Sequence, residues 1–82
     1  MTTTTAGLEQ QILDVLVSEY EAPADTTGQT SFDLLGFDSL VLVELGVALT
    51  KRYGVEIGDE ELREAGNAAR TAELLLSKGI TV

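Results

Sequence analysis

The amino-acid sequence predicts an all-α protein, a four-helix bundle with a long loop between helices one and two and a short third helix. Apolar residues recur with the 3.6-residue period of an amphipathic helix, and no strand pattern of any length competes with it. Pro23, Gly54 and Gly66 divide the 82-residue chain into helical segments. We expect one domain over residues 1–82, with a frayed N-terminus over residues 1–5.

The first helix is expected over residues 6–20, because Pro23 follows and proline both lacks an N–H donor and restricts the residue before it. Its core-facing side comprises Leu8, Ile12, Val15 and Leu16. Residues 21–38 then form a connection rich in Asp, Thr, Gly and Ser, and loops of this length are often functional. The apolar residues expected to pin this loop to the core are Phe32, Leu34, Leu35 and Phe37.

The second helix should begin at Asp38 or Ser39, both good N-cap residues, and end at Gly54, where glycine can adopt the left-handed cap conformation. Its core face comprises Leu42, Leu45, Leu49 and Tyr53. Gly46 lies in the middle of the helix, where glycine costs about 1 kcal/mol relative to alanine. Two explanations stay open: close helix packing, or an open space near the inner face of the helix.

Two shorter helices complete the prediction. The third is expected over residues 60–64, after Gly58 and Asp59, and Gly66 with Asn67 interrupts the pattern again. Thr71 is expected to cap the last helix, over residues 72–78, before Gly79. Three consecutive leucines of this helix should face inward at least in part, and they are Leu74, Leu75 and Leu76.

Charge is distributed unevenly along the chain. The net charge is −9, and no Lys or Arg occurs before Lys51. The first fifty residues carry eight acids: Glu9, Asp14, Glu19, Glu21, Asp25, Asp33, Asp38 and Glu44. Such a field repels nucleic acid and anionic membranes and attracts proteins with basic patches, although it also serves solubility alone. Neither a signal peptide nor a membrane-spanning stretch is recognisable, so we expect a cytoplasmic protein, acting as a monomer.

The composition also limits the chemistry. Cysteine is absent, which excludes disulfides and thiolate chemistry from the protein itself, and histidine is absent, which removes the commonest general base and metal ligand. A serine nucleophile of the hydrolase type would have no histidine to activate it. The sequence therefore predicts that the chain is not an enzyme and holds no metal.

A second stripe runs along the second helix, away from its core face. It comprises Leu40, Glu44, Val47 and Lys51, which fall within roughly 60° of one another at 100° per residue. A solvated face has no need of the two aliphatic side chains. The stripe either contacts a later helix or forms a docking surface for partner proteins.

Ser39 stands where the long loop meets the second helix. One interpretation makes it simply part of a capped helix start. Alternatively, a phosphate on its hydroxyl would meet the free N–H groups at the positive end of the helix. Gly36 would let the loop turn just before it. Asp38 would be an acid beside the attachment point, available to a modifying enzyme or to a divalent metal that the enzyme carries.

The run Leu-Gly-Phe-Asp-Ser-Leu, residues 35–40, resembles the attachment site of the acyl carrier proteins. Glu44 follows the serine by five residues, and a second run, Leu-Thr-Lys-Arg-Tyr-Gly-Val over residues 49–55, stands at the matching distance. Together they are most similar to the discrete carrier proteins of type II aromatic polyketide synthases. The resemblance is strong over about residues 33–62 and is compatible, by helix order, with nearly the whole chain.

The resemblance implies that Ser39 carries a 4′-phosphopantetheine arm taken from coenzyme A, within a motif that includes Gly36, Phe37, Asp38 and Leu40. The arm's thiol would hold malonyl and growing polyketide chains as thioesters. The implied partners are a phosphopantetheinyl transferase, a malonyl acyltransferase, a ketosynthase/chain-length-factor pair and tailoring enzymes. The docking residues would be Leu40, Glu44, Val47 and Lys51.

Some residues depart from related carriers. Fatty-acid carriers are usually acidic along the second helix, whereas Lys51 and Arg52 are basic. Peptidyl carriers usually have a second glycine and a histidine or aspartate before the serine, where this chain has Phe37. A carrier for fatty acid, reducing polyketide or aminoacyl synthesis stays an alternative, as does a non-carrier helical module in which Ser39 is only a cap.

Overall fold

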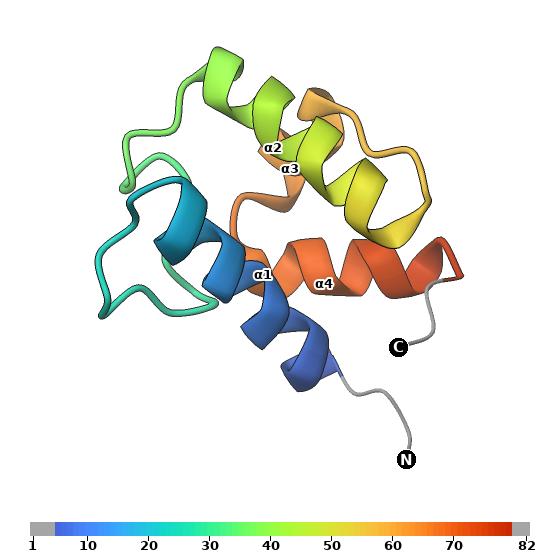
Figure 1. The fold of residues 1–82 in the computed structure, drawn as a ribbon, viewed down its shortest axis with the longest axis horizontal. Coiled ribbons are helices and arrows are strands. Elements are labelled where there is room, and N and C mark those ends of the chain that lie inside the picture. The colour runs from blue at the N-terminus through green and yellow to red at the C-terminus, as the bar shows by residue number, and fades with distance from the viewer. Residues whose placement is uncertain (1–4, 80–82) are drawn as a thin grey trace.

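The structure, a computed structural model, describes residues 5–79. The helices are α1 (Thr5–Glu19), α2 (Ser39–Tyr53), α3 (Asp59–Ala65) and α4 (Ala68–Ser77). α1 packs against α4, α2 against α3, and α3 against α4 (Figure 1). The predicted all-α architecture, with a long first loop and a short third helix, is confirmed. The fraying expected at the N-terminus concerns residues 1–4, which lie outside the described residues, together with Thr5, the first residue of α1.

The core is built from the faces that the periodicity predicts. Every predicted core residue of α1 is buried, and so are three of the four on α2, with Tyr53 partly buried. The Tyr53 hydroxyl donates to Gln11 Oε1 at 2.8 Å, which joins the end of α2 to α1. On α4, Leu75 is fully buried and its leucine neighbours are partly so, as expected. Within residues 5–79, no helix is long and apolar enough to span a bilayer.

The start of α4 was predicted wrongly. The helix begins at Ala68 because Asn67 is its N-cap, with the Asn67 side chain accepting a hydrogen bond from the Arg70 amide at 2.8 Å. Thr71 lies inside the helix and is buried, and its hydroxyl donates to the Asn67 carbonyl at 2.8 Å. The expected cap is therefore one turn too late.

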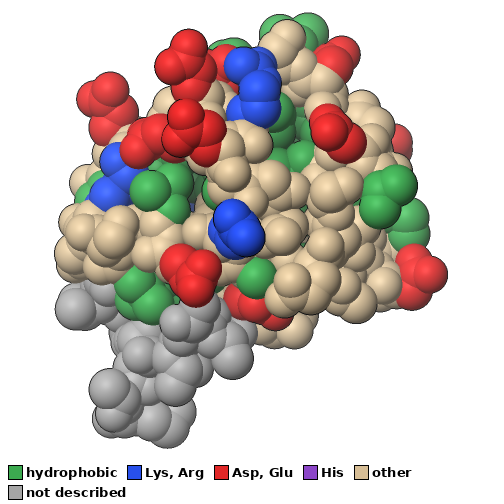
Figure 2. All heavy atoms as spheres, turned by 180° about the vertical axis from the view of Figure 1, so that it is seen from behind, with side chains coloured by type: hydrophobic (Ala, Val, Ile, Leu, Met, Phe, Trp, Pro, Cys, Tyr) green, Lys and Arg blue, Asp and Glu red, His purple; other side chains and the backbone are tan. Residues whose placement is uncertain are grey.

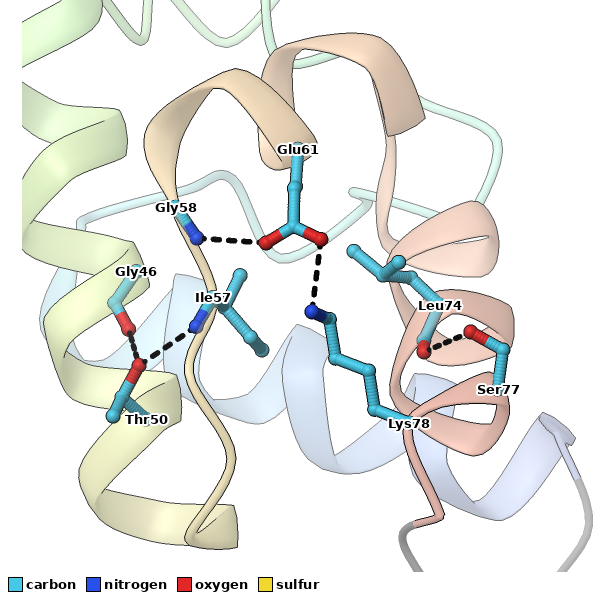
Figure 3. Close-up of polar contacts among 8 residues, drawn as sticks. All are labelled: Gly46, Thr50, Ile57, Gly58, Glu61, Leu74, Ser77 and Lys78. Atoms are coloured by element: carbon cyan, nitrogen blue, oxygen red, sulfur yellow. Dashed lines mark hydrogen bonds and ion pairs between the residues drawn. The ribbon is translucent and has the colours of Figure 1, made fainter.

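Close packing explains Gly46, although the backbone packed against it belongs to the segment between α2 and α3 and not to a helix, as was expected. A Cβ at this position would lie 2.7 Å from the carbonyl oxygen of Ile57, so the segment after α2 crosses directly over the glycine. Thr50 fixes this crossing (Figure 3). Its hydroxyl donates to the Gly46 carbonyl at 2.7 Å and accepts from the Ile57 amide at 3.1 Å. The backbone of Ile57 thus occupies the space over Gly46.

The long loop is tied to the junction between α3 and α4. The Phe32 amide donates to the Gly66 carbonyl at 2.8 Å, and the Ala69 amide donates to the Gly28 carbonyl at 3.0 Å. Phe32 and Phe37 are buried and Leu35 is partly buried, as predicted for residues that pin the loop. Leu34 was predicted wrongly, since 82% of it is exposed. The loop returns to the first turn of α2 (Figure 1).

Candidate functional site

Ser39 is the first residue of α2 and its side chain is exposed. Within residues 5–79 its hydroxyl has no hydrogen-bond partner. The helix behind it has 15 residues, and its unpaired N–H groups give this end a partial positive charge. The oxygen of Ser39 is therefore accessible to an enzyme, in a place where an added phosphate would be favoured.

Asp38 holds the helix start in place. It is the N-cap, with extended backbone at φ −85° and ψ −178°, and its Oδ1 accepts a hydrogen bond from the Val41 amide at 3.0 Å. Its own carbonyl accepts from the Leu42 amide at 3.0 Å. Because Asp38 satisfies these first-turn amides, the adjacent serine is free of capping duty. Of the two predicted cap candidates, the structure selects Asp38.

Aromatic packing anchors the residue before the cap. The ring of Phe37 stacks on Phe32 with 5.9 Å between centroids and lies tilted against Tyr20 at 6.2 Å. Burial raises the pKa of the Tyr20 hydroxyl, and the nearby carboxylates of Glu19 and Glu44 raise it further. Tyr20 is therefore neutral at ordinary pH. Its contact with Phe37, together with the stacking of Phe37 on Phe32, anchors the end of the loop just before Asp38 and Ser39.

The predicted stripe on α2 is exposed along its whole length: Leu40, Glu44, Val47 and Lys51 all reach solvent. Leu40 is 66% exposed and Val47 is 51% exposed. These side chains are therefore not buried against a later helix, which was the first explanation for the stripe. The sequence analysis missed Val43, which is 45% exposed, although its spacing from Leu40 and Val47 places it on the same side.

The surface around Ser39 carries acidic side chains from the first half of the chain. Asp33, Asp38 and Glu44 are all exposed around the start of α2, and Lys51 and Arg52 lie in its last turn. On the face turned away from Figure 1, acidic side chains spread across the surface with basic ones among them (Figure 2). The end of α2 that presents Ser39 thus favours an approaching surface of positive charge.

Comparison with known proteins decides the family. Residues 10–75 match the family described as "Phosphopantetheine attachment site". The chain is 35% identical over 79 residues to the polyketide-8 synthase acyl carrier protein 2 of Streptomyces avermitilis, covering 94% of this chain and 91% of that one. The chain belongs to the acyl carrier protein family. It is accordingly a non-catalytic carrier whose prosthetic group is phosphopantetheine, as its resemblance implied.

Other acyl carrier proteins share part of its sequence. The chain is 31% identical over 62 residues to the monensin polyketide synthase acyl carrier protein of Streptomyces virginiae, covering 76% of this chain and 70% of that one. It is 43% identical over 58 residues to the meromycolate extension acyl carrier protein of Mycolicibacterium aurum, covering 70% and 57%. The relatives therefore include carriers of different systems.

The residues of this acyl carrier protein fit a covalently attached phosphopantetheine. The group joins a protein through a phosphate ester. The ester forms on a free hydroxyl, and its negative charge needs a solvent-exposed position. Ser39 offers that hydroxyl at the exposed N-terminus of α2, and Asp38 leaves it unhindered by taking the capping hydrogen bond. The positive end of the helix suits the negative charge of the diester.

Proposed function

We propose that this acyl carrier protein bears its 4′-phosphopantetheine on Ser39 and carries malonyl and growing polyketide chains between the enzymes of a type II polyketide synthase, in the cytoplasm. The observation that carries the proposal is the position of Ser39. It is an exposed hydroxyl, free of hydrogen bonds to the described residues, on the first residue of a helix capped by its neighbour Asp38.

In the attachment step, this chain would supply the attacking oxygen. Ser39 Oγ would form a phosphoester bond to the pantetheine-bearing phosphorus of coenzyme A while the pyrophosphate P–O bond breaks. Adenosine 3′,5′-bisphosphate leaves, and the hydroxyl proton passes to a base of the transferase. The chain has no histidine to act as that base, so its own contribution is to present the oxygen. When bound, the group supplies a thiol that holds acyl chains as thioesters.

Tethering makes weak protein contacts sufficient. A linked substrate has a high effective concentration at each enzyme, so the carrier itself need not bind tightly. The stripe formed by Leu40, Glu44, Val47 and Lys51 supports this role because it is exposed and begins beside Ser39. The partners would be a phosphopantetheinyl transferase, a malonyl acyltransferase, a ketosynthase/chain-length-factor pair and tailoring enzymes, each with a basic face toward the anionic loop.

The polyketide pathway is supported by two relatives named for polyketide synthases, by Phe37 in the loop before the cap, and by the basic pair Lys51–Arg52 in α2. A carrier of another acyl pathway is the second candidate, and the meromycolate extension relative at 43% identity favours it. The two differ in which ketosynthase accepts the loaded protein.

Intact-mass spectrometry tests the attachment. After incubation with coenzyme A, Mg²⁺ and a broad-specificity phosphopantetheinyl transferase, the protein should gain the mass of one phosphopantetheine. Ser39→Ala should gain nothing, because it lacks the attacking oxygen. No gain by the folded wild-type protein with more than one transferase, or an equal gain by Ser39→Ala, would contradict the proposal. Offering the malonylated protein to ketosynthases of each pathway then separates the two candidates.

A further inference from the structure

One leucine near the attachment site is displayed to solvent without serving the core. Leu34 is 82% exposed, more than Val17, Leu40, Val43 or Val47, the other exposed large apolar side chains of residues 5–79. Single exposed apolar residues are common on proteins, so exposure alone identifies nothing. The construction of the turn that carries Leu34 gives the exposure its meaning.

Hydrogen bonds close the backbone turn that carries Leu34. The Phe37 amide donates to the Phe32 carbonyl at 3.0 Å and closes the turn at its base, where the two rings stack and are buried. The Leu34 amide donates to Ser31 Oγ at 3.1 Å. Phe32 is in turn fixed to the Gly66 carbonyl at 2.8 Å. Leu34 is therefore exposed on a turn that is closed by hydrogen bonds and anchored to the core, and not on an irregular loop.

Leu34 and Ser39 are close enough for one partner protein to cover both. Ser39 is the fifth residue after Leu34, so at most about 18 Å lies between their Cα atoms, and the closed turn shortens this. A standard interface covers about 800 Å² on each partner, a patch of about 16 Å radius. Leu40 and Val43 follow Ser39 in α2. Exposed apolar side chains thus precede and follow the serine in the chain.

Among the enzymes that use a carrier, one must approach Ser39 most closely. The transferase has to bring its reacting atoms to bonding distance of Ser39 Oγ, whereas enzymes that act on the thiol work at the far end of the arm. The exposed carboxylates of Asp33 and Asp38 lie beside Leu34 and Ser39 in the chain, and residues 1–50 hold no basic side chain. A surface that covers this turn must therefore be positively charged around any apolar pocket.

We propose that Leu34 is a recognition residue for the phosphopantetheinyl transferase, and that it enters an apolar pocket of that enzyme bordered by Lys or Arg side chains. The assignment rests on the proposed attachment at Ser39. It makes Leu34 a determinant of how well the transferase binds the unmodified carrier, with no part in the phosphoryl transfer itself.

Steady-state modification of the unmodified protein tests this assignment with coenzyme A, Mg²⁺ and the transferase. Leu34→Ala should lower kcat/KM about tenfold, mainly by raising KM, because truncating an anchoring side chain weakens an interface by about that factor. Leu34→Met, which keeps an apolar side chain, should stay within about twofold of wild type. Val17→Ala removes an exposed aliphatic side chain from α1 and is the matched control, with unchanged kcat/KM. All three variants should keep the wild-type melting temperature.

Each of the other possible results would contradict one specific part of the proposal. Wild-type kcat/KM in Leu34→Ala would overturn the role of Leu34 and leave the attachment at Ser39 intact. A loss seen only when the already modified protein is offered to a ketosynthase, with normal modification, would overturn the assignment to the transferase. Failure of the wild-type protein to gain mass would instead overturn the attachment, and with it the recognition.

Discussion

Gly46 occupies a position where two local preferences oppose each other. Glycine in a helix interior costs about 1 kcal/mol relative to alanine, which favours replacement. The backbone of Ile57 crosses at a distance that leaves no room for a Cβ, with its carbonyl oxygen 2.7 Å from where that atom would lie. The neighbour is backbone and is held by the Ile57 amide's hydrogen bond to Thr50, so it has little freedom to retreat.

Gly46→Ala should therefore destabilise the protein in spite of the better helix propensity of alanine. We expect the free energy of unfolding to fall by about 1–3 kcal/mol, the usual range for an added methyl group without space. Urea denaturation followed by circular dichroism measures it. Ala48→Gly, at a half-buried position of the same helix, reports the propensity cost of glycine, about 1 kcal/mol, together with the loss of one methyl contact. A Gly46→Ala protein more stable than wild type would show that the crossing segment moves away easily.

At the scale of elements, Glu61 joins the start of α3 to the end of α4 (Figure 3). Its Oε1 accepts from the Gly58 amide at 3.0 Å, and its Oε2 pairs with Lys78 Nζ at 2.8 Å. The hydrogen bond from Lys78, followed by that from Gly58, lowers the pKa of the Glu61 carboxyl below its ordinary value of 4.5. The ionised form is thus favoured in the folded protein, and stability gained this way is present above about pH 4.5 and lost as pH falls through the lowered pKa.

Glu61→Gln should accordingly be less stable than wild type at neutral pH, and the difference should shrink as the pH is lowered below 4.5. The urea midpoints of both proteins, measured from about pH 7 to about pH 3, test this expectation. Glu60→Gln is the matched control, since Glu60 is an exposed neighbour on the same helix and should show no comparable convergence. A constant difference between Glu61→Gln and wild type at every pH would contradict a role for the ionised carboxylate.

The elements differ in how far the sequence predicts them. The core faces of α1 and α2 follow from periodicity because one helical period decides which residues are buried together. The start of α4 does not, because Asn67 and Thr71 are both suitable caps and only the folded backbone decides which accepts the amide of Arg70. The α3 bounds shift by one residue at each end for the same reason, since a glycine and a capping glutamate replace an obvious cap.

The candidate site divides in the same way. Ser39, Asp38 and the exposed stripe could be predicted, since a local motif and one helix face are enough. The exposure of Leu34 could not, because the direction in which it points depends on the stacking of Phe32 and Phe37 and on the bond from Phe32 to the α3–α4 junction. Apolar character alone predicts burial, and the tertiary structure of the turn overrides it.

At the scale of the whole molecule, the net charge of −9 acts on two processes in opposite directions. Like charges repel within the folded protein and lower its stability, whereas the same charges attract a basic partner and speed association. The first fifty residues contain eight acids and no Lys or Arg. Both effects are therefore concentrated in the part of the chain that includes Ser39. Screening by salt weakens each of them.

Raising the ionic strength from about 0.01 M to about 1 M shortens the Debye length from about 30 Å to about 3 Å. Over this range we expect the melting temperature to rise, because self-repulsion is screened, while kcat/KM for modification by the transferase falls by about tenfold or more. Thermal unfolding and intact-mass rates on one sodium chloride series measure both. Because the expected signs are opposite, a loss of rate cannot arise from unfolding by salt. A kcat/KM independent of ionic strength would show that the acidic loop serves solubility alone and does not steer the partner to Ser39.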